Sequence, residues 1–236
     1  MVEQTQYTRS TTRDWTVVVA ALLALLAFPA SGVAQGAPAG SEPLPATVPI
    51  FPLPDVTLLP NSTQPFHIFE PRYRAMVADA LAGDSVIGMV VLQPGHEADY
   101  RGRPPVYAIG CAGVIVTAER LPDGRYDIVL RGLTKFTILH EDASKPYRLA
   151  DVEELVEAVT DRDLLTSRRQ QLEAAVRAAF PRAPTPRADL SDEEVIDGLS
   201  IALPMAPAQR LELLQADGPL ERAAILVRVI RGGAQA

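Results

Sequence analysis

Cysteine is nearly absent from this chain, because Cys111 is the one cysteine among 236 residues. A single thiol cannot form an internal disulfide, so an apolar core must stabilise the fold unaided. Basic residues are also scarce, since 22 Lys and Arg face 29 Asp and Glu and the net charge is −7. An acidic surface repels the phosphates of nucleic acids and of anionic lipids, which argues against both as partners. The hydrophobic fraction of 47% is typical of a globular protein with a packed core.

Residues 1–34 have the layout of a secretory signal, in which two arginines precede an apolar run from Trp15 to Phe28 and small residues follow. The run is shorter than the roughly 20 residues that span a bilayer. Cleavage after Ala34 and cleavage after Ala39 both fit the pattern, and an uncleaved anchor is the alternative. Residues 35–47 are rich in Pro, Ala and Gly and predict a flexible linker. We therefore expect a protein exported to the periplasm, or one anchored there by its N-terminal segment.

Residues 48–157 have the pattern of a small β domain that contains one helix. The helix is expected to begin at Pro71, whose missing N–H costs nothing at a first helical position, and to stop at Gly83. Val86–Leu92 is a continuous apolar run, which predicts a buried strand. Residues 93–105 are polar and rich in Gly and Pro, which predicts a surface loop. About six short strands with one helix indicate a small closed or nearly closed sheet.

The clearest local element is a hairpin with Leu121–Arg125 as its turn, because Pro-Asp-Gly suits both the fixed and the positive φ that a turn needs. Alternating apolar residues then predict a return strand that ends at Gly132 and is followed by a separate strand. Arg131 and Lys135 flank this glycine and are expected on a solvated face. A last strand is predicted at Tyr147–Leu155.

From Thr160 onward the apolar period changes to 3.6, which predicts a bundle of roughly three or four helices over residues 160–232. Ser191–Glu194 has the sequence of a capping box at the start of one helix. Pro207 starts another helix, and Gly218-Pro219 opens the last. Together with the strands, these helices make the expected fold class α+β.

Several stretches of the sequence stand out: Ile50–Val56 followed by Leu59-Pro60, then Pro65–Arg74 (PFHIFEPRYR), then Ile109–Val116, Leu121–Arg125 and Val129–Leu133, then Leu190–Ile230. In this order and spacing, they resemble the N-terminal substrate-binding domain family of Lon proteases. The resemblance covers about residues 47–232, nearly all of the chain after the linker. The helical tail is similar to the bundle that follows the β domain in Lon.

The resemblance implies a PUA-like small β-barrel or sheet domain at residues 48–157, a helical bundle at residues 160–232, and a role in recognising polypeptide substrates. The sequence departs from full Lon because it has no G-x-x-x-x-G-K-[ST] phosphate loop, and the Ser/Lys protease domain has no room after residue 232. We therefore expect a non-catalytic protein without cofactor or metal. Its expected ligand is a polypeptide or a partner protein, such as a protease or a chaperone.

Some residue patterns suggest chemistry, and each has a simpler structural interpretation. Gly83–Ser85 resembles a hydrolase motif, but no histidine follows His140, so a helix stop is favoured. Ser144 and Lys145 are adjacent in a loop, which is the wrong arrangement for a base that holds a nucleophile. His96, Glu97 and Asp99 could bind a metal, but they lie in a polar loop without a second histidine, and a solvated loop is favoured. His67 is expected to be a structural histidine, with Glu70 as the one carboxylate partner that the sequence indicates. Cys111 is expected to be a buried thiol and not a nucleophile.

Partner binding is expected to use exposed apolar side chains or a free sheet edge to which an extended peptide adds as a strand. Two interpretations fit Arg72 and Arg74: a partner-facing ion cluster, or a helix start in which Glu70 caps the helix and pairs with an arginine. The helix start accounts for these residues and is favoured. A cryptic hydrolase and a structural or self-assembling domain are the alternative functions. The candidate contact residues are Leu58, Leu59, Tyr100, Arg72 and Arg74.

Overall fold

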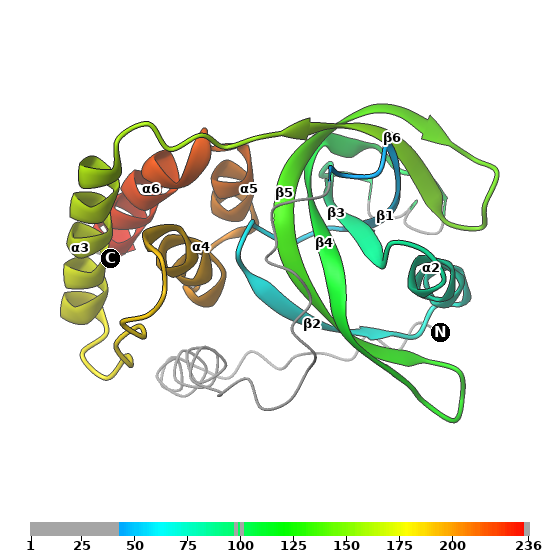
Figure 1. Cartoon of the computed structure of the whole chain (residues 1–236), viewed down its shortest axis with the longest axis horizontal. Coiled ribbons are helices and arrows are strands. Elements are labelled where there is room, and N and C mark those ends of the chain that lie inside the picture. Colours follow the sequence, from blue (N-terminus) through cyan, green and yellow to red (C-terminus); the bar gives the residue numbers. More distant parts are fainter. Residues whose placement is uncertain (1–42, 97–98, 100–101, 234–236) are drawn as a thin grey trace.

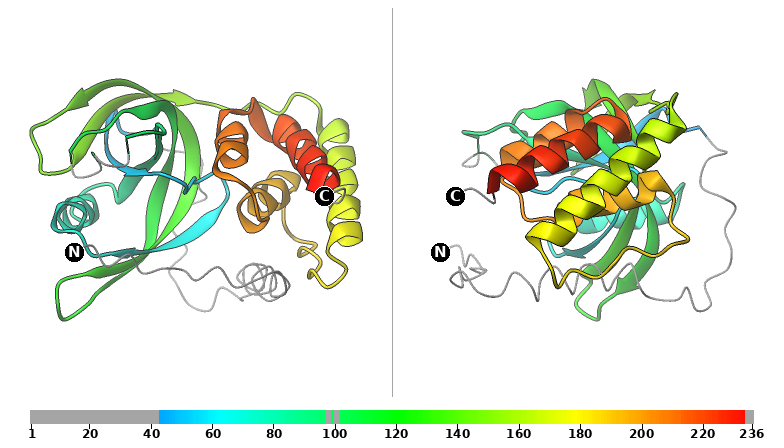
Figure 2. Two further views of the ribbon diagram at one scale, coloured as in Figure 1. Left: turned by 180° about the vertical axis from the view of Figure 1, so that it is seen from behind. Right: turned by 90° about the vertical axis from the view of Figure 1, so that its left-hand side faces the viewer.

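The computed structural model describes residues 43–96, 99 and 102–233, and it combines one mixed sheet with helices (Figure 1). Helix α2 lies on one side of the sheet, and the C-terminal helices lie together at the opposite side (Figures 1 and 2). The predicted signal and most of the predicted linker fall outside the described residues. The helices of the described part are α2 (Pro71–Leu81), α3 (Arg162–Ala179), α4 (Asp192–Ala202), α5 (Pro207–Gln215) and α6 (Gly218–Gly233).

The sheet closes on itself. Its strand order is β2-β5-β4-β3-β1-β6, and β5 pairs with β6 as well, so five strands form a ring and β2 lies beside it. The β1–β3 pair is parallel and the other pairs are antiparallel. The strands are β1 (Thr47–Leu53), β2 (Thr63–Ile68), β3 (Val86–Leu92), β4 (Val106–Arg120), β5 (Tyr126–Asp142) and β6 (Arg148–Leu155).

Phe136 fills the inside of this ring. Its side chain is 0% exposed and lies in a small apolar cluster with Ile50, Val90 and residues from the other ring strands. A Cβ atom at Gly88 or Gly110 would lie 2.8 Å or 2.5 Å from the Phe136 ring. Both positions therefore need glycine, because the aromatic ring occupies the space that a side chain would take.

Strand β5 runs without a break through Gly132, so the predicted strand end at this residue is wrong. The Gly132 N–H donates to the Ser62 carbonyl at 2.8 Å, and a Cβ atom at Gly132 would lie 2.0 Å from the carbonyl oxygen of Leu59. The register between β4 and β5 shifts beside it, between Ala112 and Gly113. The glycine thus lets the segment before β2 approach the strand closely while the strand continues.

The predicted helix at Pro71 is confirmed, with the proline in its first turn and its apolar face buried. Glu70 holds the N-cap position, but its side chain makes no capping hydrogen bond. At the other end, Ser85 has φ 58° and turns the chain into β3. All seven residues of Val86–Leu92 are buried, as the apolar run predicts.

The C-terminal helices begin where the sequence indicates. The Ser191 hydroxyl accepts from the Glu194 N–H at 3.1 Å, and the Glu194 carboxylate accepts from the Ser191 N–H at 2.7 Å, so the capping box is confirmed. Helix α3 packs against α6 and α4, and α5 contacts β4. Within the described residues, no helix has the length and apolar character needed to cross a bilayer.

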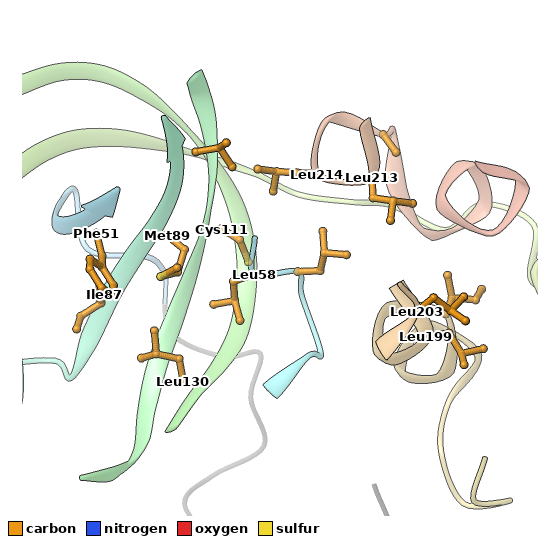
Figure 3. Close-up of a cluster of buried hydrophobic side chains, with 14 of the residues drawn as sticks. Phe51, Leu58, Ile87, Met89, Cys111, Leu130, Leu199, Leu203, Leu213 and Leu214 are labelled. Atoms are coloured by element: carbon orange, nitrogen blue, oxygen red, sulfur yellow. The ribbon is translucent and has the colours of Figure 1, made fainter. Parts of the chain in front are cut away.

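One apolar core joins the sheet to the C-terminal helices. Met89 and Cys111 from the sheet and Leu199 and Leu213 from the helices belong to the same buried cluster (Figure 3). Leu214 of helix α5 points toward the strands, and Leu213 lies on the side of the neighbouring helices (Figure 3). The two parts therefore share a core rather than being joined by a linker alone.

Candidate functional site

A groove of about 520 Å³ lies between the sheet and the C-terminal helices, and we name it the central groove. The segment before β2 and strand β5 form one side of it. The chain that links β6 to α3, with the first turns of α4 and α6, forms the other. The residues that matter for its properties are Asn61, Leu133, Glu154, Val156, Glu157, Val159, Arg162, Asp197 and Arg222.

Buried charges border the groove. Arg222 is 1% exposed and donates two hydrogen bonds to the Glu157 carboxylate, at 2.6 and 2.7 Å. Its Nε donates to Asp197 at 2.7 Å, and Asn61 donates to the other oxygen of Asp197 at 3.0 Å. The backbone of Asn61 has the left-handed conformation, with φ 58°. These four residues come from α6, the β6–α3 link, α4 and the segment before β2, so the network ties four parts of the chain together.

Lys135 completes this network, and its predicted place on a solvated face is wrong. The side chain is 6% exposed, and its ammonium lies 2.8 Å from Glu157 Oε1. It also donates to the carbonyl oxygens of Leu214 at 3.2 Å and Ala216 at 2.5 Å, at the end of α5. Arg131, on the other side of Gly132, is exposed as predicted. The buried lysine satisfies carbonyl groups at the helix end that have no partner within the helix.

The two carboxylates of the network respond to burial differently. Burial raises the pKa of Asp197 to about 6, against the opposing effect of the Arg222 guanidinium. Burial also acts to raise the pKa of Glu157, but Arg222 and Lys135 outweigh it and lower that pKa below its usual value. Glu157 has two cationic partners where Asp197 has one, which accounts for the difference. At neutral pH both carboxylates are ionised and the four charges of the network balance.

Apolar and acidic side chains face solvent around the groove. Val156 is 78% exposed, an unusual position for a β-branched apolar residue, and Leu133 and Val159 are partly buried beside it. Glu154 is exposed, and Arg162 pairs with Glu193 across the groove wall. This surface offers apolar contact along with carboxylate acceptors.

The structure separates the predicted contact residues. Leu58 and Leu59 are both 0% exposed, so the prediction that they lie at a surface is wrong. Leu58 packs in the core beneath the sheet (Figure 3), and Leu59 uses its backbone to accept a hydrogen bond from the Ser62 hydroxyl. Both leucines belong to a segment of the core. The polarity of the neighbouring residues alone does not show whether such a segment lies in the core or at the surface. Tyr100 falls outside the described residues.

Arg72 and Arg74 contact different neighbours and do not form one cluster. The Nε of Arg72 donates to Glu70 at 3.0 Å, and its guanidinium lies 4.5 Å from the Tyr73 ring centroid. Arg74 donates to the Asp123 carbonyl at 3.2 Å, at the turn of the β4–β5 hairpin. The pairing part of the helix-start interpretation is confirmed for Arg72, while Arg74 faces a separate surface.

Comparison with protein families matches residues 47–231 to the model described as the ATP-dependent protease La (LON) substrate-binding domain. The chain belongs to this family. A Lon protease of Trichlorobacter lovleyi is 30% identical over 185 residues, and one of Anaeromyxobacter dehalogenans is 29% identical over 124 residues. These alignments cover 75% and 52% of this chain but 22% and 14% of those proteases. The chain thus spans a small part of the length of its curated Lon relatives.

Solved structures of Lon N-terminal domains have the same fold. A Lon N-terminal domain protein from Xanthomonas campestris has a TM-score of 0.57 at 24% identity, and the match covers 77% of this chain and 97% of that one. The N-terminal domain of the Mycobacterium avium complex Lon protease has a TM-score of 0.60 at 20% identity and covers 78% and 98%. The sheet and helices described above are therefore a Lon N-terminal domain fold.

The chemical candidates of this Lon-family chain have structural roles. Cys111 is fully buried, and burial raises the pKa of its thiol. His67 contacts Asp127 at 2.5 Å, so its carboxylate partner is Asp127 and not Glu70. Gly83–Ser85 joins α2 to β3, as the helix-stop interpretation predicts. Within the described ranges, no three His, Cys, Asp or Glu side chains gather as a metal site would require.

Neither the resemblance to Lon nor any sequence motif predicted the charged residues of the central groove. Asp197 interrupts an apolar stretch of α4, between Ile196 and Leu199, and Arg222 lies in the apolar stretch of α6. A charged residue at a core position of an amphipathic helix is the signal that could have identified both, because such a residue is buried only with a partner. The identity of that partner depends on the tertiary fold.

Proposed function

We propose that this protein is a non-catalytic module that binds polypeptide through the central groove. The observation that carries the proposal is the match of residues 47–231 to a substrate-binding domain of a protease, since the substrates of a protease are polypeptides. The groove supports it with exposed Val156 and partly buried Leu133 and Val159. Apolar side chains of an extended chain would pack on these residues, and the acidic side chains around them would favour segments with basic residues.

Binding of an unfolded chain tests this proposal directly. The probe is a fluorescein-labelled, reduced and carboxymethylated protein that stays unfolded, titrated with the full-length chain and followed by fluorescence anisotropy. Val156→Asp places a charge among the apolar contacts and is expected to weaken binding by about ten-fold, because the apolar contact is lost. Leu139→Asp is the matched control, because Leu139 is 64% exposed on β5 and does not line the groove.

The control separates a specific groove from general stickiness. We expect Leu139→Asp to keep the affinity of the unaltered chain. Equal losses in the two variants would show that any exposed apolar side chain contributes, and unchanged affinity in Val156→Asp would remove the groove from the proposal. Absence of binding by the unaltered chain would favour a self-assembling role, which a molar mass from light scattering would then reveal.

The proposal includes export and a partner. The signal-like sequence of residues 1–34 supports a periplasmic location, or anchoring by an uncleaved N-terminus. Outside the cytoplasm the module would present polypeptides to a partner such as a protease or a chaperone, and the PUA-like character of the sheet belongs to the same proposal. The mass of the N-terminal peptide of the protein from its own cells tests export, because a start near residue 35 or 40 would reveal cleavage and a start at Met1 an intact segment.

A further inference from the structure

The outer part of strand β4 has a free edge. Strand β3 pairs with β4 only as far as Val114, and the Ile115 N–H donates to the Ser85 carbonyl at 2.8 Å. Beyond this point the described residues pair β4 with β5 alone. All five residues of Val116–Arg120 are exposed. The hairpin therefore extends past its neighbour (Figure 1), and the place that β3 leaves in the sheet is open to another strand.

The register shows which backbone groups point to this open place. Leu121 donates to the Arg125 carbonyl at 2.8 Å, which makes them a hydrogen-bonded pair. Because hydrogen bonding alternates along an antiparallel pair, Glu119 bonds to β5. The N–H and C=O groups of Ala118 and Arg120 then point away from β5, toward the open place. Among the described residues no other strand pairs with Ala118 or Arg120 on this side, so the two residues form a short template for strand addition.

A groove lies between helix α2 and the end of this hairpin, where Arg120 of β4 lines it. It measures about 510 Å³ and is lined on the helix side by Arg74, Ala75 and Ala78. On the hairpin side it is lined by Arg120 and Tyr126, which lie opposite each other in the β4–β5 register. The two alanines have short side chains, and longer side chains at these positions of α2 would fill the groove.

The groove is basic in a protein whose net charge is −7. The Arg120 side chain makes no hydrogen bond or ion pair within the part of the chain that the structure describes, and the Arg74 guanidinium donates only to the Asp123 carbonyl there. The one carboxylate of the groove, that of Asp123, pairs with Arg125 at 2.6 Å. Glu119 points to the other face of the strand because side chains alternate. Two guanidinium groups thus face the groove with little to neutralise them.

We propose that this groove binds an extended acidic segment of a partner polypeptide, which adds as a strand to the edge of β4 at Ala118 and Arg120. Acidic residues at every second position lie on one face of the added strand, where Arg74 and Arg120 receive their carboxylates. The site lies apart from the central groove and does not depend on the function proposed there. Backbone bonds supply affinity, and the two arginines select acidic over basic segments.

The test uses the full-length chain and a fluorescein-labelled eight-residue peptide in which Asp alternates with Thr. The matched peptide has Lys in place of Asp. We expect the Asp peptide to bind and Arg120→Glu to weaken it by about ten-fold or more, because like charges then meet. Ala118→Pro removes one outward N–H at a position that an edge strand tolerates, and it is expected to weaken the same peptide.

Two controls and one direct readout complete the design. Arg177→Glu makes the same charge change at an exposed site on α3, and Val156→Asp alters the central groove. Both are expected to leave the affinity for the Asp peptide unchanged. Hydrogen exchange should slow at the Ala118 and Arg120 amides when the peptide binds. Because the function proposed for the central groove includes binding of basic segments, the Lys peptide is compared by its protection of these two amides. Equal protection by the Lys peptide, full binding of the Asp peptide by Arg120→Glu, or unchanged exchange at these amides with the Asp peptide would each overturn the proposal.

Discussion

Lys135 shows how a single charged side chain can join two parts of a fold. The sequence around Gly132 predicts a solvated face for both Arg131 and Lys135. In the structure Arg131 is exposed, but Lys135 on the same strand is not. The carbonyl groups that hold its ammonium belong to residues 79 and 81 positions away, Leu214 and Ala216. No local pattern reports such partners, so the buried position of Lys135 could not be predicted from the sequence. The partners of Arg222 and Asp197 lie 25 to 136 positions away in the sequence and were missed for the same reason.

Replacing Lys135 by Met is expected to lower the free energy of unfolding by about 3 kcal/mol, because two buried carbonyls lose their donor and Glu157 loses one of its two cations. Urea denaturation followed by far-ultraviolet circular dichroism measures the change. Lys145→Met is the control, since the Lys145–Asp79 pair is 48% exposed on each side and should contribute less than about 1 kcal/mol. Similar losses in the two variants would contradict the structural role of Lys135.

Asp197 gives the stability of the protein a pH dependence of defined sign. Its folded-state pKa of about 6 lies above the ordinary value of 3.8, so the folded protein binds this proton more tightly than the unfolded chain. The resulting stabilisation is fully present below about pH 4 and is lost as the pH rises through 6. Relative to Asp197→Asn, the unaltered chain should therefore lose up to about 3 kcal/mol between pH 4 and pH 7. Urea titrations of both proteins across this range measure the difference, and a constant difference would contradict the raised pKa.

Elements with local signals were predicted well. The proline at the start of α2, the apolar run of β3 and the capping box of α4 each act within a few residues, and the structure confirms all three. The break expected at Gly132 is the counterexample. Glycine there permits close contact with the backbone of Leu59, 73 positions earlier in the chain, and the strand itself continues to Asp142. A glycine needed for a long-range contact and one that ends a strand have the same local sequence pattern.

Gly132→Ala tests this explanation of β5. A Cβ atom would lie 2.0 Å from the Leu59 carbonyl oxygen, so backbone must move and the free energy of unfolding should fall by about 3 kcal/mol or more. Gly232→Ala is the matched control in helix α6, where a Cβ atom meets nothing within 4 Å. That variant should be unchanged or more stable by up to about 1 kcal/mol, since alanine favours a helix. Thermal unfolding of the two variants compares them, and equal stability would mean that β5 tolerates a side chain at Gly132.

The arrangement of the sheet and the helices relative to each other is the part that the sequence did not predict. The structure has the mixed sheet and the helices of a Lon N-terminal domain fold. The shared core and the network of Lys135, Glu157, Asp197 and Arg222 hold them in one arrangement, which leaves the central groove between them. Leu58 and Leu59 show the consequence, because the helices and sheet bury residues that look exposed in the sequence alone.

The most direct test of polypeptide binding is hydrogen exchange of the full-length chain with and without the unfolded, carboxymethylated probe. The proposed function predicts slower exchange in the segment around Val156 and Glu157, which lines the central groove, and unchanged exchange around Leu139. Protection confined to surfaces away from the groove, or none at a probe concentration that saturates binding, would contradict the account.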